Sequence, residues 1–193
     1  MKNFVIADLK FFDEEQRIKL NFPDFETMND VVLKSWNGIV LPNDKVLIMG
    51  DIGSGTFEEM KSIIKRLNGE LYYSSNLIDE KYTREQIKEM GIDFTWNVSM
   101  YKDIGGEENP IIYCIAPIRH IKIYEENYSL IVVDSTNPID GMVKGKMLSA
   151  DAAKWYYSPI DTDNLLEIYQ NMKEFEEMKD EEHRMDIKEA GEE

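Results

Sequence analysis

Histidine is almost absent from this chain, which has only two, His120 and His183, among its 193 residues. Cysteine is rarer still. Because Cys114 is the only one, no internal disulfide can form, and a reducing compartment, the cytoplasm, is expected. The thiol lies in the apolar run IIYCIA, which favours a buried, inert side chain. No apolar run approaches the roughly 20 residues of a membrane-spanning helix, and no secretory signal is expected at the N-terminus.

Basic residues are also scarce: 22 lysines and arginines face 38 acids, a net charge of −16. That balance argues against binding a nucleic acid backbone or an anionic membrane, since both need a basic surface. Residues 174–193 hold ten of the acids and three of the bases, and they lose apolar periodicity. We therefore expect a single domain over residues 1–173 and an acidic C-terminal tail over 174–193, either flexible or a helix extension.

Hydrophobic periodicity predicts a β-α-β-α-β series over residues 1–73. Strands are expected at residues 4–7, 45–49 and 70–73, and helices at 26–36 and 56–67. In the first helix, Met28, Val31, Val32 and Trp36 share one face, and residues 13–24 before it are predicted to be loop. Such a series implies parallel strands joined by helical crossovers.

The second half of the chain is richer in short strands. A helix is expected at residues 83–90, followed by strands at 94–101, 111–116, 121–124 and 130–133. Residues 147–157 are ambiguous, and their aromatic end favours a strand over a helix. A last helix is expected at 161–175. This order predicts an α/β fold in which two packed sheets are flanked by helices.

Two aspartates follow apolar runs directly: Asp8 after FVIA, and Asp51 after VLIMG. Carboxylates at strand C-termini are where open α/β sheets build metal and phosphate sites. Taken alone, however, the two are more simply turn or cap residues, by about two to one. The Gly53-Ser54-Gly55 turn could cradle a phosphate, but it lacks the Lys-Ser/Thr ending of a P-loop, so a turn before a capped helix is preferred.

The order of several motifs resembles the calcineurin-like metallophosphoesterases, in particular the small stand-alone branch found in bacteria and phages. The similarity runs through FVIADLKFF, TMNDVVLKSWNGIVLPNDKVLIMGDIGSG, GELYYSSNLID, YCIAP and LIVVDSTNP, and it spans roughly residues 1–170. Its strongest part is residues 28–55, where Trp36-Asn37, Pro42, Asp44 and Gly50-Asp51 fall in order. The resemblance implies a four-layer α/β/β/α sandwich and a two-metal hydrolase site.

Carried onto this sequence, that implied site is incomplete. The resemblance assigns residual metal-ligand positions to Asp8, Asp51 and Asn76. Every histidine of the pattern is replaced, at positions now occupied by Lys10, Leu77 (the position of the catalytic histidine), Ile115, Ser135 and Asn137. No nearby histidine substitutes for them, since His120 matches no ligand position.

The remaining oxygen donors are too few for a tight transition-metal pair, because such sites depend on imidazole. No cofactor is therefore expected; if there is one, it is a weakly bound divalent cation such as Mg²⁺, Mn²⁺ or Ca²⁺. We also expect Lys10 either to form a salt bridge with the strand-end carboxylates or to point to solvent. Loss of the histidine at position 77 removes a general acid and charge stabiliser.

The preferred functional hypothesis is a catalytically degenerate phosphoesterase-like protein that acts as a binding or regulatory module, with a phage origin as one expectation. Its partner would be another protein or a small phosphorylated ligand. An active, divergent metal-dependent phosphoesterase is the alternative, and a structural subunit of a larger assembly is a second. The expected location is the cytoplasm, that of the host if the protein is phage-encoded.

Overall fold

The computed structural model describes residues 1–74, 81–95, 111–114, 130–133 and 147–174. The first part contains β1 (Asn3–Ala7), α1 (Glu14–Lys19), α2 (Phe25–Asn37), β2 (Lys45–Met49), α3 (Phe57–Ile64) and β3 (Glu70–Ser74). The second contains α4 (Arg84–Met90), β4 (Ile92–Thr95), β5 (Ile111–Cys114), β6 (Leu130–Val133), β7 (Met147–Ser149), β8 (Ile160–Asp161) and a 3₁₀ turn, Thr162–Asn164. A helix at residues 165–174 follows.

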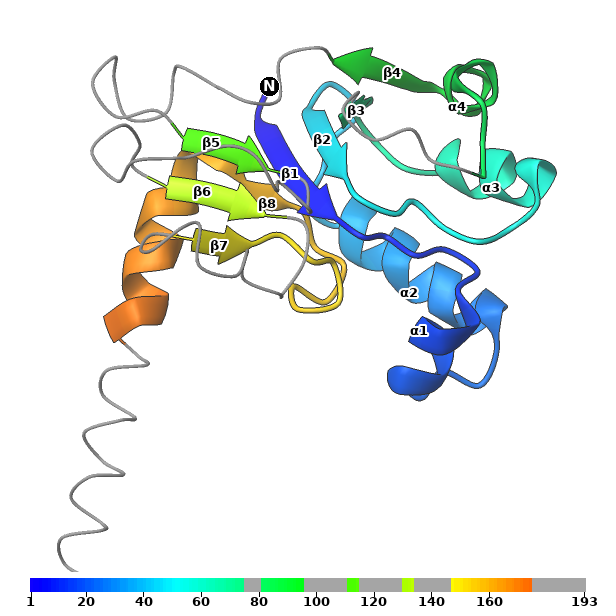
Figure 1. Cartoon of the computed structure of the whole chain (residues 1–193), viewed down its shortest axis with the longest axis horizontal. Coiled ribbons are helices and arrows are strands. Elements are labelled where there is room, and N and C mark those ends of the chain that lie inside the picture. Colours follow the sequence, from blue (N-terminus) through cyan, green and yellow to red (C-terminus); the bar gives the residue numbers. More distant parts are fainter. Residues whose placement is uncertain (75–80, 96–110, 115–129, 134–146, 175–193) are drawn as a thin grey trace, which may run out of the picture.

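Two sheets organise the chain. The larger has the strand order β4-β3-β2-β1-β8, in which the first four strands are parallel and β8 is antiparallel to β1. The smaller has the order β5-β6-β7 and is entirely parallel. The β-α-β-α-β series over residues 1–73 is therefore confirmed, and the fold is α/β with a five-stranded mixed sheet flanked by helices (Figure 1).

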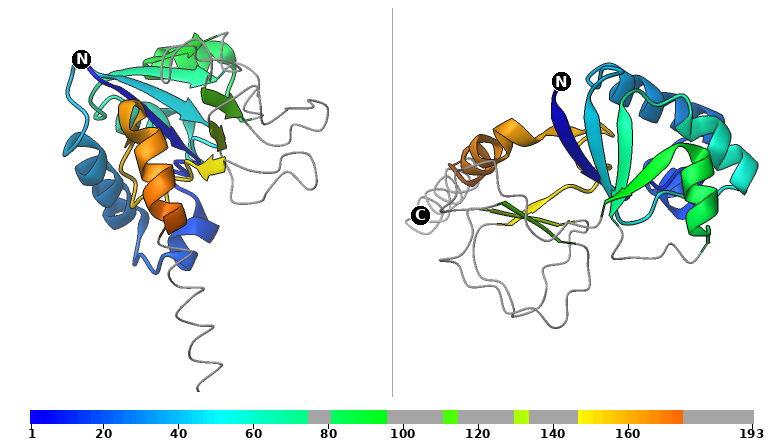
Figure 2. Two further views of the ribbon diagram at one scale, coloured as in Figure 1. Left: turned by 90° about the vertical axis from the view of Figure 1, so that its left-hand side faces the viewer. Right: turned by 90° about the horizontal axis from the view of Figure 1, so that it is seen from above.

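Alternation along the central strands divides the core between the two faces of the larger sheet. Phe4 and Ile6 of β1 join a buried cluster with α2, α3 and α4, whereas Val5 and Ala7 join a second cluster with β6, β7 and the 165–174 helix. Figure 2 shows the same division, with the helices on one side of the larger sheet and the smaller sheet and C-terminal helix on the other. Burial on both faces explains why β1 and β2 read as continuous apolar runs.

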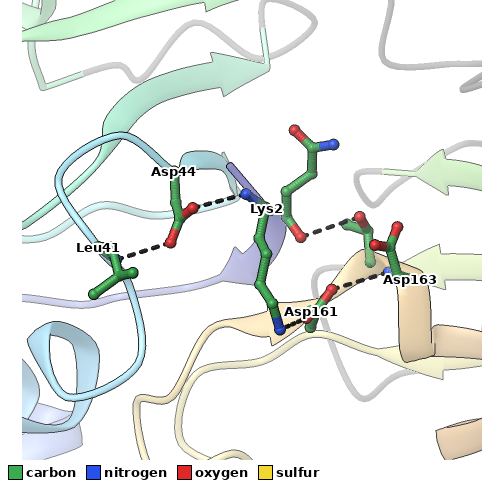
Figure 3. A network of polar contacts seen from close by, with 7 residues as sticks. Lys2, Leu41, Asp44, Asp161 and Asp163 are labelled. Atoms are coloured by element: carbon green, nitrogen blue, oxygen red, sulfur yellow. Dashed lines mark hydrogen bonds and ion pairs between the residues drawn. The ribbon is translucent and has the colours of Figure 1, made fainter.

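Contacts at both ends of β1 join the first part of the chain to the last. At the N-terminal end, the Asp44 carboxylate accepts hydrogen bonds from the backbone N–H groups of Lys2 (2.7 Å) and Leu41 (2.9 Å), and the Lys2 ammonium pairs with Asp161 at 2.6 Å (Figure 3). At the C-terminal end, Ala7 pairs in parallel with Asp151, just after β7. This bridge joins the segment after β7 to the end of β1, directly before Asp8.

Local signals determine where the helices begin. Thr56 and Glu59 form the expected capping box of α3, and Thr83 and Gln86 form that of α4, which ends at Gly91 in a left-handed conformation. The expected helix at 56–67 is shorter, because α3 ends at Ile64. No helix among the described residues is long and apolar enough to cross a membrane.

Some sequence expectations are wrong. Residues 13–24 are not all loop, because Asp13 caps the short helix α1. Only 147–149 of the expected strand 147–157 form β7; an isolated bridge at Asp151 and turns over 152–157 follow. Val31 is exposed, and Leu33 replaces it on the buried face of α2. The 161–175 segment starts as strand and 3₁₀ turn before the helix at 165.

Other expected strands are seen in part. The strand expected at 94–101 starts earlier, at Ile92, and its residues 96–101 lie outside the described part of the chain. Strands β5 and β6 confirm those expected near 111 and 130, although 115–116 are not described. The strand expected at 121–124 and the tail from 175 also lie outside the described residues.

Candidate functional site

The register of two parallel strands places Asp8 and Asp51 beside each other. Ala7 of β1 pairs with Met49 of β2, so the two strands end at the same level and both chains turn there. The turns use left-handed backbone at Asp8 (φ 53°) and Gly50 (φ 68°). Left-handed backbone is readily adopted by glycine and tolerated by aspartate. The pairing expected from the sequence is therefore present.

Both carboxylates accept backbone hydrogen bonds within these turns. Asp8 Oδ1 accepts the N–H of Asp51 at 2.9 Å, and Asp51 Oδ1 accepts the N–H of Gly53 at 2.8 Å. The first bond joins the β1 turn to the β2 turn, and the second closes the glycine-rich turn on itself. An aspartate that accepts the N–H two residues later forms a common turn motif. Each carboxylate thus has a role in shaping the strand-end loops.

Close backbone packing fixes the loop after Asp51. Phe11 and Gly53 form an isolated parallel bridge, and a Cβ at Gly53 would lie 2.5 Å from the Phe11 carbonyl oxygen. Beneath the turn, the buried Tyr73 hydroxyl donates to the Gly50 carbonyl at 2.8 Å. These contacts hold the two strand-end loops in one arrangement.

Lys10 does not form the expected ion pair. Its backbone N–H donates to the Asp51 carbonyl at 3.3 Å, but no carboxylate of the described residues forms a salt bridge with its ammonium. The half-buried Lys10 side chain therefore does not neutralise Asp8 or Asp51 by direct pairing. Its backbone, with φ 49°, helps shape the turn instead.

A second polar cluster, which no sequence motif predicts, lies on the same loops. The Lys81 ammonium donates to Ser54 Oγ at 2.6 Å, and the Ser54 hydroxyl donates to Asp13 Oδ2 at 3.4 Å. Asp13 also caps α1 by accepting the Gln16 N–H at 2.7 Å. The Asp13-Glu14-Glu15-Gln16 run indicates the cap of α1, because a capping residue precedes an acidic first turn, but it does not indicate the contacts with Ser54 and Lys81.

Tyr157 and Asp151 border this cluster from the far end of the chain. Burial raises the pKa of the Tyr157 hydroxyl, the nearby Asp151 and Asp13 carboxylates raise it further, and a hydrogen bond from Gln16 opposes the shift. Asp151 accepts the Ala153 N–H at 3.0 Å and lies opposite Ala7. Their sequence pattern predicts a strand over 147–157, so it gives no indication of this position.

The described residues offer few donors for a metal ion. Among them, no group of three or more histidine, cysteine, aspartate or glutamate side chains is placed to hold one. The other positions from the resemblance, Asn76, Leu77, Ile115, Ser135 and Asn137, lie outside the described residues, as does His120. Asp8 and Asp51 supply two carboxylates, which is fewer than the donors that a two-metal hydrolase centre uses.

Comparison with known proteins gives a structural neighbour but no family. A crystal structure of a protein of unknown function from Aquifex aeolicus matches with a TM-score of 0.61 over 86% of this chain and 98% of that one. At 16% sequence identity, the match shows a shared fold alone. No family model and no curated protein matches the chain.

Proposed function

We propose that this chain is a catalytically degenerate phosphoesterase-like protein that acts as a binding or regulatory module. In this proposal its architecture is a four-layer α/β/β/α sandwich. Two features support that arrangement: the larger sheet packs helices on one face, and its other face shares a buried cluster with the smaller sheet. The expected ligand is a protein or a small phosphorylated molecule.

The proposal rests on the hydrogen bonds that the strand-end carboxylates accept. Asp8 accepts the N–H of Asp51 at 2.9 Å, which joins the two strand-end turns, and Asp51 accepts the N–H of Gly53 at 2.8 Å, which closes its own turn. These bonds engage one oxygen of each carboxylate, whereas a carboxylate that bridges two cations directs its oxygens at the metals. These residues are therefore suited to maintaining the shape of the strand-end loops.

The chemistry of the replaced positions points the same way. Imidazole side chains bind transition metals and transfer protons near neutral pH. Neither property is supplied by the side chains now at those positions, which are lysine, leucine, isoleucine, serine and asparagine. A protein with this fold can still present its loops to a partner, because fold does not determine function.

An active, divergent phosphoesterase is the second candidate. It is favoured by the register that places Asp8 and Asp51 together at the ends of β1 and β2. Two carboxylates and water can hold a Mg²⁺ or Ca²⁺ ion weakly. Such an ion, when bound, would polarise a phosphoryl oxygen and activate water.

Hydrolysis of bis-p-nitrophenyl phosphate tests the choice between these candidates. The purified full chain and the Asp51→Ala variant are assayed with Mn²⁺, Mg²⁺ and Ni²⁺ in turn. The proposal predicts equal background rates for both proteins with every metal. Metal-dependent turnover that disappears in Asp51→Ala would contradict it and establish the second candidate.

A further inference from the structure

An apolar groove of about 610 Å³ lies at the edge of the larger sheet where β1 begins, which is the opposite edge from the strand-end aspartates. Its lining includes Phe4 of β1 and Ile160 of β8, both buried. Ile39 and Leu41 line it from the turn between α2 and β2, and Ile168 lines it from the C-terminal helix. Segments from both ends of the chain therefore meet at this surface.

Exposed hydrophobic side chains gather at this groove. Seven large hydrophobic side chains of the described residues are exposed, and three of them, Met1, Ile39 and Leu41, line it. Leu41 alone is 64% exposed. Contiguous exposed apolar surface, bordered by polar residues, is typical of a site that another molecule covers.

The polar groups in the groove wall already have partners. The Asp44 carboxylate accepts two backbone N–H groups. Asp161 accepts the Lys2 ammonium at 2.6 Å and the N–H of Asp163 at 3.1 Å (Figure 3). The Trp155 indole donates to a backbone carbonyl at 2.7 Å. An apolar surface can therefore cover these groups without leaving a buried donor or acceptor unpaired, whereas a charged ligand would have to compete with the internal bonds.

The charges around the groove are nearly balanced, unlike those of the whole chain. The lining contains the cation of Lys2 and the carboxylates of Asp44 and Asp161, whereas the chain carries −16. Asp44 is buried, so the exposed charges here are the Lys2 ammonium, on a side chain that is 61% exposed, and the neighbouring Asp163 carboxylate. A face with one exposed charge of each sign can complement itself across a two-fold axis. A basic partner would instead be attracted to more acidic parts of the surface.

We propose that two copies of this chain associate through this groove, with Ile39 and Leu41 of each copy packed against the apolar lining of the other. Two chains of charge −16 repel one another, and physiological salt screens that repulsion beyond about 8 Å. Contact is therefore least opposed where the facing surfaces are apolar and nearly neutral. The groove lies at the other edge of the sheet from Asp8 and Asp51, so this association does not depend on the function proposed for them.

Sedimentation-velocity ultracentrifugation of the full chain, from about 1 to 200 µM, tests this interface. The decisive variant is Leu41→Asp. Its matched control is Ile18→Asp, because Ile18 is exposed to nearly the same extent, 63% against 64%, but does not line the groove. A second pair, Asp163→Lys and Glu85→Lys, changes the net charge equally at the groove and at an exposed position of α4. Circular dichroism establishes that each variant is folded.

We expect a monomer–dimer equilibrium that shifts toward the dimer as NaCl rises from about 50 to 300 mM, because salt screens the repulsion between the two chains. Leu41→Asp should weaken dimerisation about tenfold or more, and Ile18→Asp should leave it unchanged. Asp163→Lys should weaken it although the net negative charge falls, whereas Glu85→Lys should not. If Leu41→Asp fails to fold, this second pair decides.

A wild type that stays monomeric at every concentration and salt would overturn the proposal. So would a dimer that Leu41→Asp and Ile18→Asp weaken equally, or that neither weakens. Fluorescence of the apolar dye ANS tests the other occupant. Dye binding by a monomeric wild type, lost in Leu41→Asp but kept in Ile18→Asp, would assign the groove to a small apolar ligand and exclude the second copy.

Discussion

Replacing Asp51 distinguishes a turn-forming carboxylate from a metal ligand by its effect on stability. Asp51 Oδ1 accepts the N–H of Gly53, a buried residue, at 2.8 Å. In Asp51→Ala this N–H loses its acceptor. In Asp51→Asn a side-chain oxygen remains, and only the charge is lost. We therefore expect the alanine variant to be clearly less stable than the asparagine variant.

The size of the effect follows from the one bond removed. Loss of the carboxylate acceptor of this part-buried N–H destabilises the fold by about 1 kcal/mol. For a domain of this size that corresponds to a melting temperature lower by about 2–4 °C. Thermal unfolding followed by circular dichroism, at neutral pH with excess EDTA, measures it. EDTA removes any stabilisation by a bound cation, so the comparison reports the turn alone.

A rise in melting temperature, instead of the predicted fall, would refute this role for Asp51. Carboxylates held together for a metal repel one another when the metal is removed, so neutralising one of them raises stability. If both variants melt at or above the wild-type temperature in EDTA, Asp51 is not stabilising its turn. That result would contradict the interpretation of Asp51 as a turn-forming residue of a degenerate metal site.

Two further predictions concern the same framework. Gly53→Ala brings a Cβ within 2.5 Å of the Phe11 carbonyl oxygen, so we expect the free energy of unfolding in urea to fall by about 3 kcal/mol. The control is Gly91→Ala, where φ is +101° and the space is open, and for it we expect a fall of about 1–2 kcal/mol. Equal losses in the two variants would contradict the clash. Hydrogen bonds from the backbone N–H of Lys2, and to a lesser extent from that of Leu41, lower the pKa of Asp44 in the folded protein. The stability that Asp44 contributes is therefore fully present above the ordinary aspartate pKa of about 3.9. It is lost as the pH falls through the lower pKa of the folded state. The difference in melting temperature between wild type and Asp44→Asn should therefore be largest near neutral pH and shrink in acid, and a difference that stays constant down to pH about 3 would exclude this linkage.

The elements that could be predicted from the sequence are those determined by local chemistry. The capping boxes at Thr56 and Thr83 place two helix starts, and apolar runs place β1 and β2. Because parallel strands end at one edge of a sheet, the proximity of Asp8 and Asp51 also followed from the pattern.

The parts that were missed depend on contacts between distant segments. The α1 helix has six residues and buries only Gln16, so it shows no apolar periodicity. Residues 150–157 have the composition of a strand, but Ala150 and Ala152 bond to Ala7, and Tyr157 turns with φ 59°. Only tertiary packing decides that outcome.

The contacts of the polar side chains also depend on packing between distant segments. Asp13, Ser54 and Lys81 come from three separate segments, and no local pattern indicates that they meet. Asn29 was detectable as a polar residue on the apolar face of α2. That its oxygen has no hydrogen-bond partner is seen only in the packed structure.

Mn²⁺ titration of the metal-free full chain tests the central claim most directly, with Asp51→Asn as the control. The claim is that the strand-end aspartates form a structural remnant of a metal site. It predicts weak binding, with heats that are the same for both proteins. Two tight sites per chain in the wild type, both lost in Asp51→Asn, would contradict it.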